Sequence, residues 1–566
     1  MSIQLAPTGL NPFDDPLDRI LAEIALSVQL PPSLHDKAKS RYEAVRRHLE
    51  ATTAFFDQIE HFYPQGSMAI DATISTRGTD DEYDLDIVSQ LGGRFRSMAP
   101  LEILTELEAA LADYPVQRVL RQTRCVTLFY ADKMHLDVTP SLRVYARLDR
   151  ESLITHAKGP RRSDDDRLVD MNAYGFAQWY ASRTPLELRM AKEFHRRWLD
   201  HAGLAARADA DVDDVPDQCD FIVKNTATLA LQLLKRFRNI RYASYSGRIP
   251  PSVMLSYYAG LAAQPNMSLS AMLVRLASWI IRDIEQASLY GRLLHVANPI
   301  CEADVFTDRW PESIAQQDEF AEHLQELVRS LEAMRKGEMF PNTMMDTLRD
   351  DFGDRVVTRA ADQIATEVGG GIQQSRQLYT RRGGVLLPSA AAVAGADRQS
   401  GRFGGAAPHL LRAQNLMAAA ILSIDEQVAA MNATWPQFAA RRIDRRAQSA
   451  RWVGSVRPQY ASYSLEIRYE LGSFPEVRVL SPELVRLPGN SEGQLPHVYP
   501  PAEDPTLCLF DPREGEWSPA MTIASTTVPW ALDWLACYEL WLMTGRWTGG
   551  GRHAGSASAE PMGTMQ

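Results

Sequence analysis

Acidic and glycine-containing segments in the first quarter of the chain carry residue types that suit phosphate chemistry. Gly66 and Ser67 form one pair, and the segment Tyr-Asp-Leu-Asp-Ile-Val, which begins sixteen residues after Ser67, contains Asp84 and Asp86. Alternate residues of a strand share a face, so these two carboxylates should point the same way. A third acid, Asp137, lies in a similar apolar segment, Met-His-Leu-Asp-Val-Thr-Pro-Ser, and could come from a neighbouring strand.

Three carboxylates that meet at one place repel one another unless a cation neutralises them. Mg²⁺ together with a polyphosphate is the natural occupant of such a site, because this ion prefers oxygen ligands. The Gly66-Ser67 pair fits the same chemistry. Glycine lets the backbone approach a phosphate, and backbone N–H groups with a hydroxyl can hold it. Each motif alone is also typical of an ordinary turn or a solvated strand, so the ordered set carries the prediction.

The segments around these residues predict an α+β core. We expect helices at 14–29 and 33–61, of which the second delivers the chain to the Gly-Ser turn. A mixture of helices and strands without a regular βαβ repeat is typical of this class. The other elements expected in this part are a helix at 99–113 and strands at 83–90, 116–120, 124–131 and 134–139.

Beyond about residue 205 the sequence becomes helical. The expected helices are 220–240, 250–262, 267–291, 312–337 and 341–368. They would form a second lobe, and a cleft between two lobes is the default place for an active site. Trp179 lies near the start of another helix, before residue 205, and we expect it to be a core residue.

The acidic motifs, taken with their neighbours, resemble a known enzyme family. Pro-Gln-Gly-Ser, Glu-Tyr-Asp-Leu-Asp-Ile-Val and His-Leu-Asp-Val-Thr-Pro-Ser follow one another in the order found in the polymerase-beta type of nucleotidyltransferase. They are most similar to the bacterial cGAS/DncV-like nucleotidyltransferases (CD-NTases). These are the cyclic-oligonucleotide synthases of CBASS antiphage systems. The resemblance covers roughly residues 15 to 365.

This resemblance implies roles for individual residues. It implies NTP substrates, a cyclic di- or trinucleotide product, and a separate effector that reads the product. Two Mg²⁺ (or Mn²⁺) ions would be bound by Asp84, Asp86 and Asp137. Lys235 would contact the triphosphate, although a basic residue near a helix C-terminus is also favourable through the helix dipole alone. The other implied nucleotide-binding residues are Gln65, Gly66, Ser67, Ser256 and Tyr257, of which the last would stack on the base.

Composition and charge exclude several classes of protein. The chain has 566 residues, of which 45% are hydrophobic and 23% charged, as in globular proteins of two to four domains. A net charge of −11 argues against a stable nucleic-acid partner. Five widely spaced cysteines without a CxxC pair are typical of reduced thiols. No apolar segment is long enough to cross a bilayer, so we expect a cytoplasmic protein without a membrane partner.

Residues 369–410 are rich in glycine and alanine and predict a linker. Within it, Gly404-Gly405 follows Phe403 and resembles a vestigial or cleavable end of the cyclase, or else belongs to a simple linker. The predicted division is a catalytic core at 1–205, a helical lobe at 206–368, this linker, a further domain at 411–553 and a flexible tail at 554–566.

The further domain has its own order of elements. Helices are expected at 409–431 and 436–448, strands at 463–470 and 476–480, then a proline-rich extended segment and an aromatic helix at 529–544. This order, together with Trp-Ser-Pro-Ala-Met-Thr-Ile at 517–523, resembles the ubiquitin-conjugating enzymes. It is most similar to the α+β ubiquitin-conjugating-like proteins that some CBASS systems encode beside a CD-NTase.

The second resemblance selects Cys508 as a nucleophile that carries an acyl group as a thioester. The family's His-Pro-Asn element is absent, and with it the asparagine that stabilises the oxyanion. His497, eleven residues upstream of Cys508, could stabilise the oxyanion or act as acid and base. Two alternatives stay open, namely that Cys508 is a small buried apolar residue and that the fold has lost its chemistry.

Two other functions are compatible with the sequence. One is a template-free nucleotidyltransferase that modifies RNA ends or a small molecule. The other is a chain that acts mainly as a conjugation or protein-binding module through residues 411–553. No adenylating domain is recognisable, so conjugation would require a separate activating enzyme as well as a conjugation target.

Overall fold

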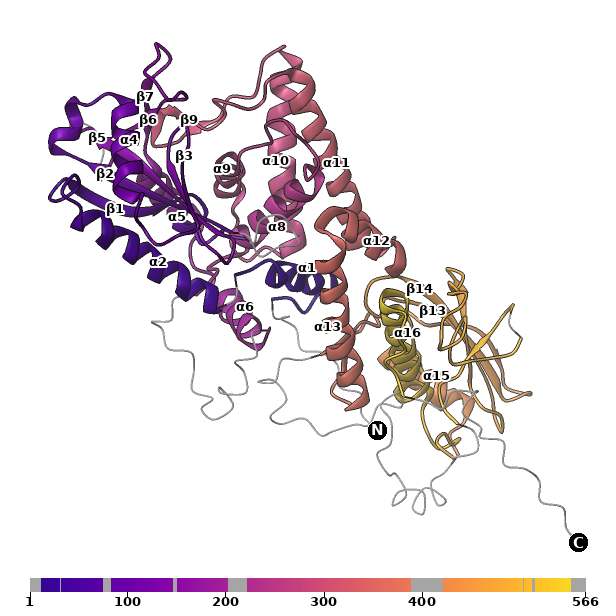
Figure 1. Cartoon of the computed structure of the whole chain (residues 1–566). Coiled ribbons are helices and arrows are strands. Elements are labelled where there is room, and N and C mark those ends of the chain that lie inside the picture. The colour runs from indigo at the N-terminus through magenta and orange to yellow at the C-terminus, as the bar shows by residue number, and fades with distance from the viewer. Residues whose placement is uncertain are drawn as a thin grey trace, which may run out of the picture. The chain divides into compact units, whose positions relative to one another are not determined.

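The computed structural model describes residues 12–30, 32–74, 83–145, 150–201, 221–387, 421–501, 503–511 and 515–550 (Figure 1). It divides into two compact units. The N-terminal unit comprises Leu21–Glu332 and Leu348–Val357. The C-terminal unit comprises Ala333–Thr347 and Thr358–Gln566, together with the first twenty residues. The predicted domain limits at 205 and 410 fall outside the described residues.

A mixed sheet lies at the centre of the predicted catalytic core in the N-terminal unit (Figure 1). Its main strand order is β1-β2-β5-β4-β3, and β6 joins β5 to β7. Strands β2 and β5 run parallel, whereas the other neighbours are antiparallel. The strands are β1 (Ile59–Gln65), β2 (Tyr83–Leu91), β3 (Arg118–Arg121), β4 (Val126–Phe129), β5 (Met134–Arg143), β6 (Ser152–His156) and β7 (Arg167–Met171).

Two helices cover this sheet with apolar side chains. Helix α2 (Pro32–Ala51) contributes Val45 and Leu49, and helix α4 (Pro100–Leu111) contributes Ile103 and Leu107 to one buried cluster. Leu85 of β2 belongs to the same cluster. Because β2 alternates between buried and more exposed residues, the side chains that flank Leu85 point to the other face.

The expected helix at 33–61 is too long. Helix α2 ends at Ala51, and residues 59–65 form β1 instead. The reason is tertiary, because β1 pairs with β2 along most of its length, with Tyr63 opposite Val88. Asp57 has a φ of +56°, which is a left-handed conformation that ends any continuous helix before the strand begins.

Helices make up the rest of the N-terminal unit and continue into the C-terminal unit. They are α1 (Pro16–Ser27), α5 (Ala173–Arg183), α6 (Leu188–His201), α8 (Thr226–Arg241), α9 (Ser252–Ala262), α10 (Leu269–Leu289), α11 (Ile314–Lys336), α12 (Pro341–Phe352) and α13 (Asp354–Gln373), with the small hairpin β8 (Ala297–Asn298) and β9 (Cys301–Val305). The helix expected at 341–368 is two helices, because Gly353 interrupts it with a φ of +95°. The buried Arg236 donates to the carbonyl of Phe352 at 2.8 Å and caps the first of them.

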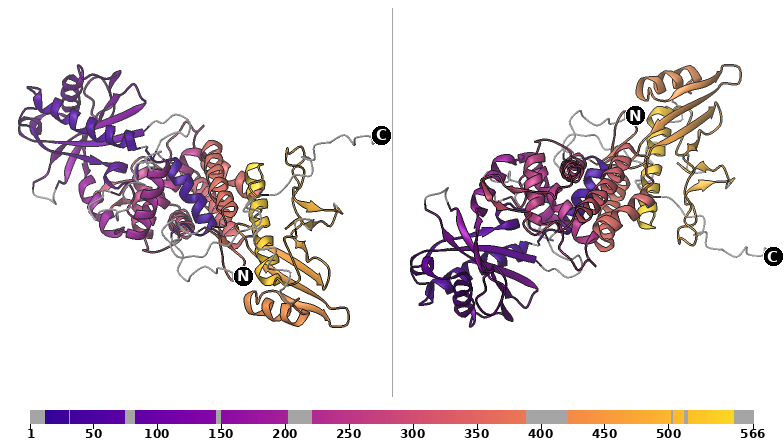
Figure 2. Two further views of the ribbon diagram at one scale, coloured as in Figure 1. Left: turned by 90° about the horizontal axis from the view of Figure 1, so that it is seen from below. Right: turned by 90° about the horizontal axis from the view of Figure 1, so that it is seen from above.

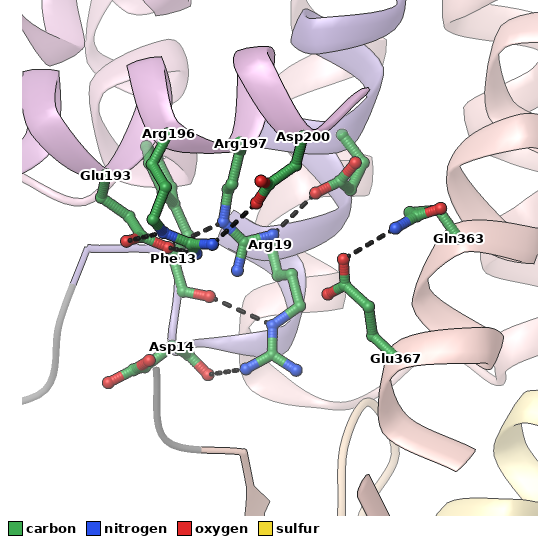
Figure 3. Close-up of polar contacts among 10 residues, drawn as sticks. Phe13, Asp14, Arg19, Glu193, Arg196, Arg197, Asp200, Gln363 and Glu367 are labelled. Carbon is green, nitrogen blue, oxygen red and sulfur yellow. Dashed lines mark hydrogen bonds and ion pairs between the residues drawn. The ribbon is translucent and has the colours of Figure 1, made fainter. Parts of the chain in front are cut away.

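Charged residues along α6 form a compact network (Figure 3). Glu193 accepts from Arg196 at 2.8 Å and from Arg197 at 2.9 Å. Arg197 also reaches the carboxylate of Glu23 in α1 at 2.7 Å, and the side chain of Glu23 is only 3% exposed. A buried carboxylate needs such a partner, so this pair holds α6 on α1. None of these residues is a candidate for catalysis.

The expected linker at 369–410 begins too early. Gly369, Gly370 and Gly371 lie in α13, and a hairpin of β10 (Leu378–Tyr379) and β11 (Val385–Leu386) follows. Packing explains these glycines, because a Cβ at Gly369 would lie 2.5 Å from the Cβ of Thr548. At Gly371 it would lie 2.2 Å from a methyl of Leu387. Residues 388–420, with Gly404-Gly405, lie outside the described residues.

The C-terminal unit contains a four-stranded antiparallel sheet in sequential order. Helix α16 lies against this sheet, and α15 precedes it in the chain (Figure 2). The helix expected at 436–448 is wrong, because residues 439–444 form the edge strand β12 through pairing with β13. The elements are α15 (Ile424–Thr434), β12 (Ala439–Asp444), β13 (Ser449–Val456), β14 (Tyr463–Glu470), β15 (Glu476–Ser481), β16 (Val498–Tyr499), β17 (Thr506–Leu507) and α16 (Thr527–Thr544).

Helix α16 is buried on almost every side and carries two buried carboxyl groups. Asp533 accepts hydrogen bonds from the Tyr379 hydroxyl at 2.8 Å and from Gln377 at 2.9 Å. Glu539 accepts from the backbone N–H groups of Tyr460 and Ala461 at 3.0 and 2.8 Å. These contacts attach the β10–β11 region and the segment before β14 to α16.

Substitution of Asp533 by Asn should change how the stability of the C-terminal unit depends on pH. Burial raises the pKa of Asp533 to about 7, although Tyr379 and Gln377 oppose this shift. The folded state therefore prefers the protonated acid. Its stabilising contribution is complete below the unfolded pKa near 4 and is lost as pH rises towards 7. The free energy of unfolding should fall between pH 5 and pH 8 in the unmodified protein. In Asp533→Asn this fall should be smaller by roughly 2–3 kcal/mol.

Chemical denaturation followed by tryptophan fluorescence at pH 5 and pH 8 would measure this change. The amide oxygen of Asn can accept both existing hydrogen bonds, so the fold should be retained. Burial also raises the pKa of Glu539 to about 7, so part of the pH dependence should persist in the variant. Glu470→Gln, at an exposed position of the same unit, is the matched control. Identical pH dependence in Asp533→Asn and the unmodified protein would contradict the prediction.

Candidate active site

The parallel pairing of β2 with β5 brings the predicted acids together. Asp86 lies directly opposite Asp137, and Asp84 lies opposite His135. Leu85, between the two acids of β2, is 1% exposed, whereas Asp84 is exposed and Asp86 is half-buried. Asp84, Asp86 and Asp137 therefore stand on one face of the sheet, opposite the face that carries the apolar core.

Neighbouring strands orient these carboxylates. The hydroxyl of Thr127, which lies opposite Asp137 on β4, donates to the Asp137 carboxylate at 2.5 Å. The ring Nδ1 of His135 lies 3.4 Å from the carboxylate of Asp84. Neither Thr127 nor His135 was predicted as a site residue, because cross-strand register decides their positions and no local sequence signal marks it.

The electrostatics of the acids show an excess of negative charge. Burial raises the pKa of Asp86 to about 7, and the charges of Asp137 and Asp84 add to this effect, whereas Lys235 opposes it. Among the residues that the structure describes, no three His, Cys, Asp or Glu side chains lie close enough to hold a metal ion. Two adjacent carboxylates nevertheless fit Mg²⁺, which usually takes one or two protein carboxylates and completes its shell with water and phosphate oxygens.

The Gly-Ser turn lies against Asp86. Gly66 follows β1 directly and begins the short helix α3 (Gly66–Ala69) with a φ of +58°. A Cβ at Gly66 would lie 2.6 Å from the Asp86 carboxylate, so only glycine allows this approach without rearrangement. Gln65 is fixed beside the turn because its side-chain amide donates to the Thr139 hydroxyl at 3.1 Å.

Lys235 connects the helical lobe with the same turn. Its ammonium group donates to the Ser67 hydroxyl at 2.7 Å and to the Ala72 carbonyl at 2.9 Å. The residue is 3% exposed. Burial lowers the pKa of Lys235 to about 7, and Arg238 adds to the shift, whereas the charge of Asp86 opposes it. Lys235 is therefore a buried amine that contacts the Gly-Ser turn and interacts electrostatically with Asp86.

Helix α9 packs against α3. Its two predicted nucleotide-binding residues, Ser256 and Tyr257, contact other protein groups. The Ser256 hydroxyl is buried and donates to the Ser252 carbonyl at 2.9 Å. The Tyr257 ring is partly exposed and stacks on Trp179, with centroids 5.6 Å apart and planes at 17°. Trp179, expected in the core, is only partly buried, and it covers Gly260, where a Cβ would lie 2.7 Å from the indole. The nucleotide-binding roles of Ser256 and Tyr257 stay predictions.

The second candidate site lies in the C-terminal unit. Strands β16 and β17 form a hairpin, with His497 immediately before it and Cys508 immediately after it. The N–H of Cys508 donates to the His497 carbonyl at 3.0 Å, so two residues eleven positions apart are neighbours. The His497 carbonyl also accepts a hydrogen bond from the Trp534 indole at 2.8 Å. The imidazole ring of His497 stacks on the Trp547 ring, with centroids 4.7 Å apart. Cys508 is half-buried.

The segment that carries the Trp-Ser-Pro-Ala-Met-Thr-Ile motif packs against the first helix of the same domain. Trp517 is 4% exposed, and the backbone at Met521 and Ile523 exchanges hydrogen bonds of 2.9 Å with the side chain of Gln427 in α15. The motif is thus a packing element that joins the first helix of the domain to the start of α16. Cys537 is fully buried in α16.

Comparisons with known proteins place both parts of the chain. The family model for the Second Messenger Oligonucleotide or Dinucleotide Synthetase domain matches residues 17–152. The cyclic dinucleotide synthase CdnG of Bradyrhizobium diazoefficiens is 52% identical over 387 residues, which are 68% of this chain and 92% of that protein. The chain belongs to the CD-NTase family. The predicted nucleotidyltransferase, with its α+β core, is thereby confirmed.

A solved structure of CdnG and one further relative are also similar to this CD-NTase. The structure of CdnG from Bradyrhizobium diazoefficiens in complex with GTP superposes with a TM-score of 0.57 and covers 62% of this chain and 99% of that one. A c-di-GMP synthase of Roseivirga ehrenbergii is 24% identical over 298 residues, 52% of this chain and 73% of that protein. The family model for the Type II CBASS E2 protein matches residues 427–554, which confirms the predicted fusion of a CD-NTase to a ubiquitin-conjugating-like domain.

None of the helices in the described part of this CD-NTase has both the length and the apolar character that a bilayer crossing requires.

Proposed function

We propose that this CD-NTase joins NTPs, GTP among them, into a cyclic dinucleotide for antiphage defence. The observation that carries the proposal is the register of β2 and β5, which sets Asp86 opposite Asp137 with Gly66 and Lys235 beside them. A catalytic acid set next to a phosphate-binding turn suits phosphoryl transfer, which depends on positioning and charge neutralisation. GTP is the natural first substrate to test, because the similar CdnG structure contains it.

The acids would hold the divalent cation. Asp84, Asp86 and Asp137 present only carboxylate oxygens. The pKa of Asp86 is raised first by burial and then by the charges of Asp137 and Asp84, and a cation would relieve this repulsion. We propose two Mg²⁺ or Mn²⁺ ions. When bound, these ions would neutralise the triphosphate and favour ionisation of the attacking ribose hydroxyl.

The remaining residues would position the nucleotide. Gly66 leaves room beside Asp86, so a phosphate could approach the backbone there. Lys235 and Ser67 already form a hydrogen-bonded pair, and both could turn to phosphate oxygens. Tyr257 would offer the ring face that Trp179 leaves uncovered to a base. Ser256 would have to leave its helix carbonyl to reach a phosphate.

The C-terminal domain would add protein chemistry to the cyclase. We propose that Cys508 carries an acyl group as a thioester, with His497 at its side. Because this chemistry starts from an activated acyl group, the partners would be a separate activating enzyme and a conjugation target. A downstream effector would read the cyclic nucleotide, and all of these partners would meet in the cytoplasm. No nucleic acid or membrane partner is proposed.

Product analysis tests the cyclase. The full-length protein should convert NTPs to a cyclic dinucleotide in the presence of Mg²⁺ or Mn²⁺, as measured by liquid chromatography and mass spectrometry. Incubations that contain single NTPs or pairs of NTPs would identify the bases. The double variant Asp84→Ala, Asp86→Ala should make none. Phosphodiesterases of known linkage specificity would distinguish 2′–5′ from 3′–5′ bonds in the product.

Other outcomes have definite meanings. A linear tail or a modified acceptor would replace the proposal by a template-free nucleotidyltransferase. Product formation by the double variant at the unmodified rate would reject the acid site. A chain that makes no nucleotide product with either metal, but forms a reducing-agent-sensitive thioester at Cys508, would favour the conjugation module instead.

A further inference from the structure

The hairpin that carries Cys508 also places a tyrosine beside the thiol. Tyr499 lies in β16 and pairs with Thr506 of β17. Thr506 is two residues before Cys508 in the chain. The Tyr499 hydroxyl donates to the Phe510 carbonyl at 3.1 Å and lies within hydrogen-bonding reach of the Cys508 side chain. The phenol therefore lies along the segment 508–510, with its oxygen near the Cys508 side chain.

Both groups are accessible to a reactant. Tyr499 is 39% exposed and Cys508 is half-buried. His497 is placed differently, because its ring stacks on Trp547 and its carbonyl accepts from the Cys508 N–H and the Trp534 indole. The His497 carbonyl thus supports the hairpin, and the hydroxyl of Tyr499 lies beside the Cys508 side chain.

We propose that the hydroxyl of Tyr499 is the oxyanion donor for acyl transfer at Cys508. The inference rests on the proposed thioester function and adds a residue to it. The sequence-based hypothesis named His497 as a candidate either for stabilising the oxyanion or for acid and base catalysis, and both roles stay predictions. A phenol can replace an amide here, because the requirement is a single O–H or N–H donor aimed at the developing negative charge.

The proposed step is an ordinary thioester exchange. The Cys508 thiol gives its proton to solvent, and the thiolate attacks the carbonyl carbon of an acyl thioester. A bond forms between Sγ and that carbon while the carbonyl π electrons move to oxygen. The Tyr499 O–H turns from the Phe510 carbonyl to this oxyanion. The intermediate then collapses, the C=O bond is restored, and the bond to the donor thiolate breaks.

The protonation state of Tyr499 suits a donor. Burial raises the pKa of Tyr499, and the neighbouring Cys508 adds to the shift. The phenol therefore keeps its proton through the neutral range in which a thiolate can form.

A comparison of two reactions of the same thiol tests the proposal. Full-length protein would be treated with phenyl thioacetate, whose reaction passes through an oxyanion, and separately with iodoacetamide, whose reaction does not. Peptide mass spectrometry would report modification at Cys508 alone, because the chain has four other cysteines. Tyr499→Phe should slow acylation about 10–100-fold and change alkylation less than about twofold. Tyr469→Phe removes a hydroxyl elsewhere in the same domain and should change neither rate.

Each other outcome overturns the assignment. Equal acylation of Tyr499→Phe and the unmodified protein would show that Tyr499 does not act on the oxyanion, while the thioester function survives. A parallel fall of acylation and alkylation would assign Tyr499 to thiol exposure or ionisation instead. Alkylation of Cys508 in the unmodified protein without any acylation would reject both the thioester function and the role of Tyr499.

Discussion

Asp137→Asn is expected to reduce nucleotide synthesis at least about 1,000-fold. The substitution removes one negative charge from the acid set while leaving an oxygen that can still accept the Thr127 hydroxyl. The strand pairing of Asp137 with Asp86 should persist, because it depends on the backbone. The loss should therefore appear in the catalytic rate and in Mn²⁺ affinity, with little change in thermal stability. Pyrophosphate release and calorimetric titration with Mn²⁺ would measure the two effects.

Asp113→Asn is the matched control, because its side chain is 86% exposed on the same unit. It should retain the rate and the Mn²⁺ affinity of the unmodified protein. If Asp137→Asn kept most of the synthesis activity, the acids would not form the catalytic site. If it lost activity together with its folded structure, Asp137→Glu would separate the roles of charge and shape, since it keeps the charge.

Gly66→Ala is expected to reduce synthesis about 100-fold, although it adds a single methyl group. The new Cβ would lie 2.6 Å from an oxygen of Asp86, so either the turn or the carboxylate has to move. The φ of +58° at this position adds backbone strain, which should lower the free energy of unfolding by about 1–2 kcal/mol. Steady-state kinetics with GTP and thermal denaturation would measure both effects.

Gly291→Ala is the control that adds backbone strain like that of Gly66→Ala without a close contact to another residue. Gly291 has a φ of +63°, close to that of Gly66, but a Cβ there would meet no atom within 4 Å. This variant should lose about the same stability and keep its activity. Equal activities of the two variants would show that the approach of Gly66 to Asp86 is not needed for synthesis.

The distribution of glycines shows what local patterns can and cannot predict. The glycines at 369–371 have the composition of a linker, but α13 uses them where Thr548 and Leu387 pack against its backbone. Similarly, residues 439–444 have no strong strand pattern and become β12 because β13 offers them a partner. In both places a tertiary neighbour decides the conformation, and a single sequence does not name that neighbour.

The alternation in the acidic motif determined by itself that Asp84 and Asp86 share a face, because a strand has a two-residue period whatever surrounds it. The two motif sets likewise determined the family of the cyclase and the kind of domain fused to it. The tertiary structure alone decided that Asp86 faces Asp137, that Lys235 reaches Ser67, and that Tyr499 lies at Cys508. These pairs depend on strand register and helix packing, which arise from contacts between segments distant in sequence.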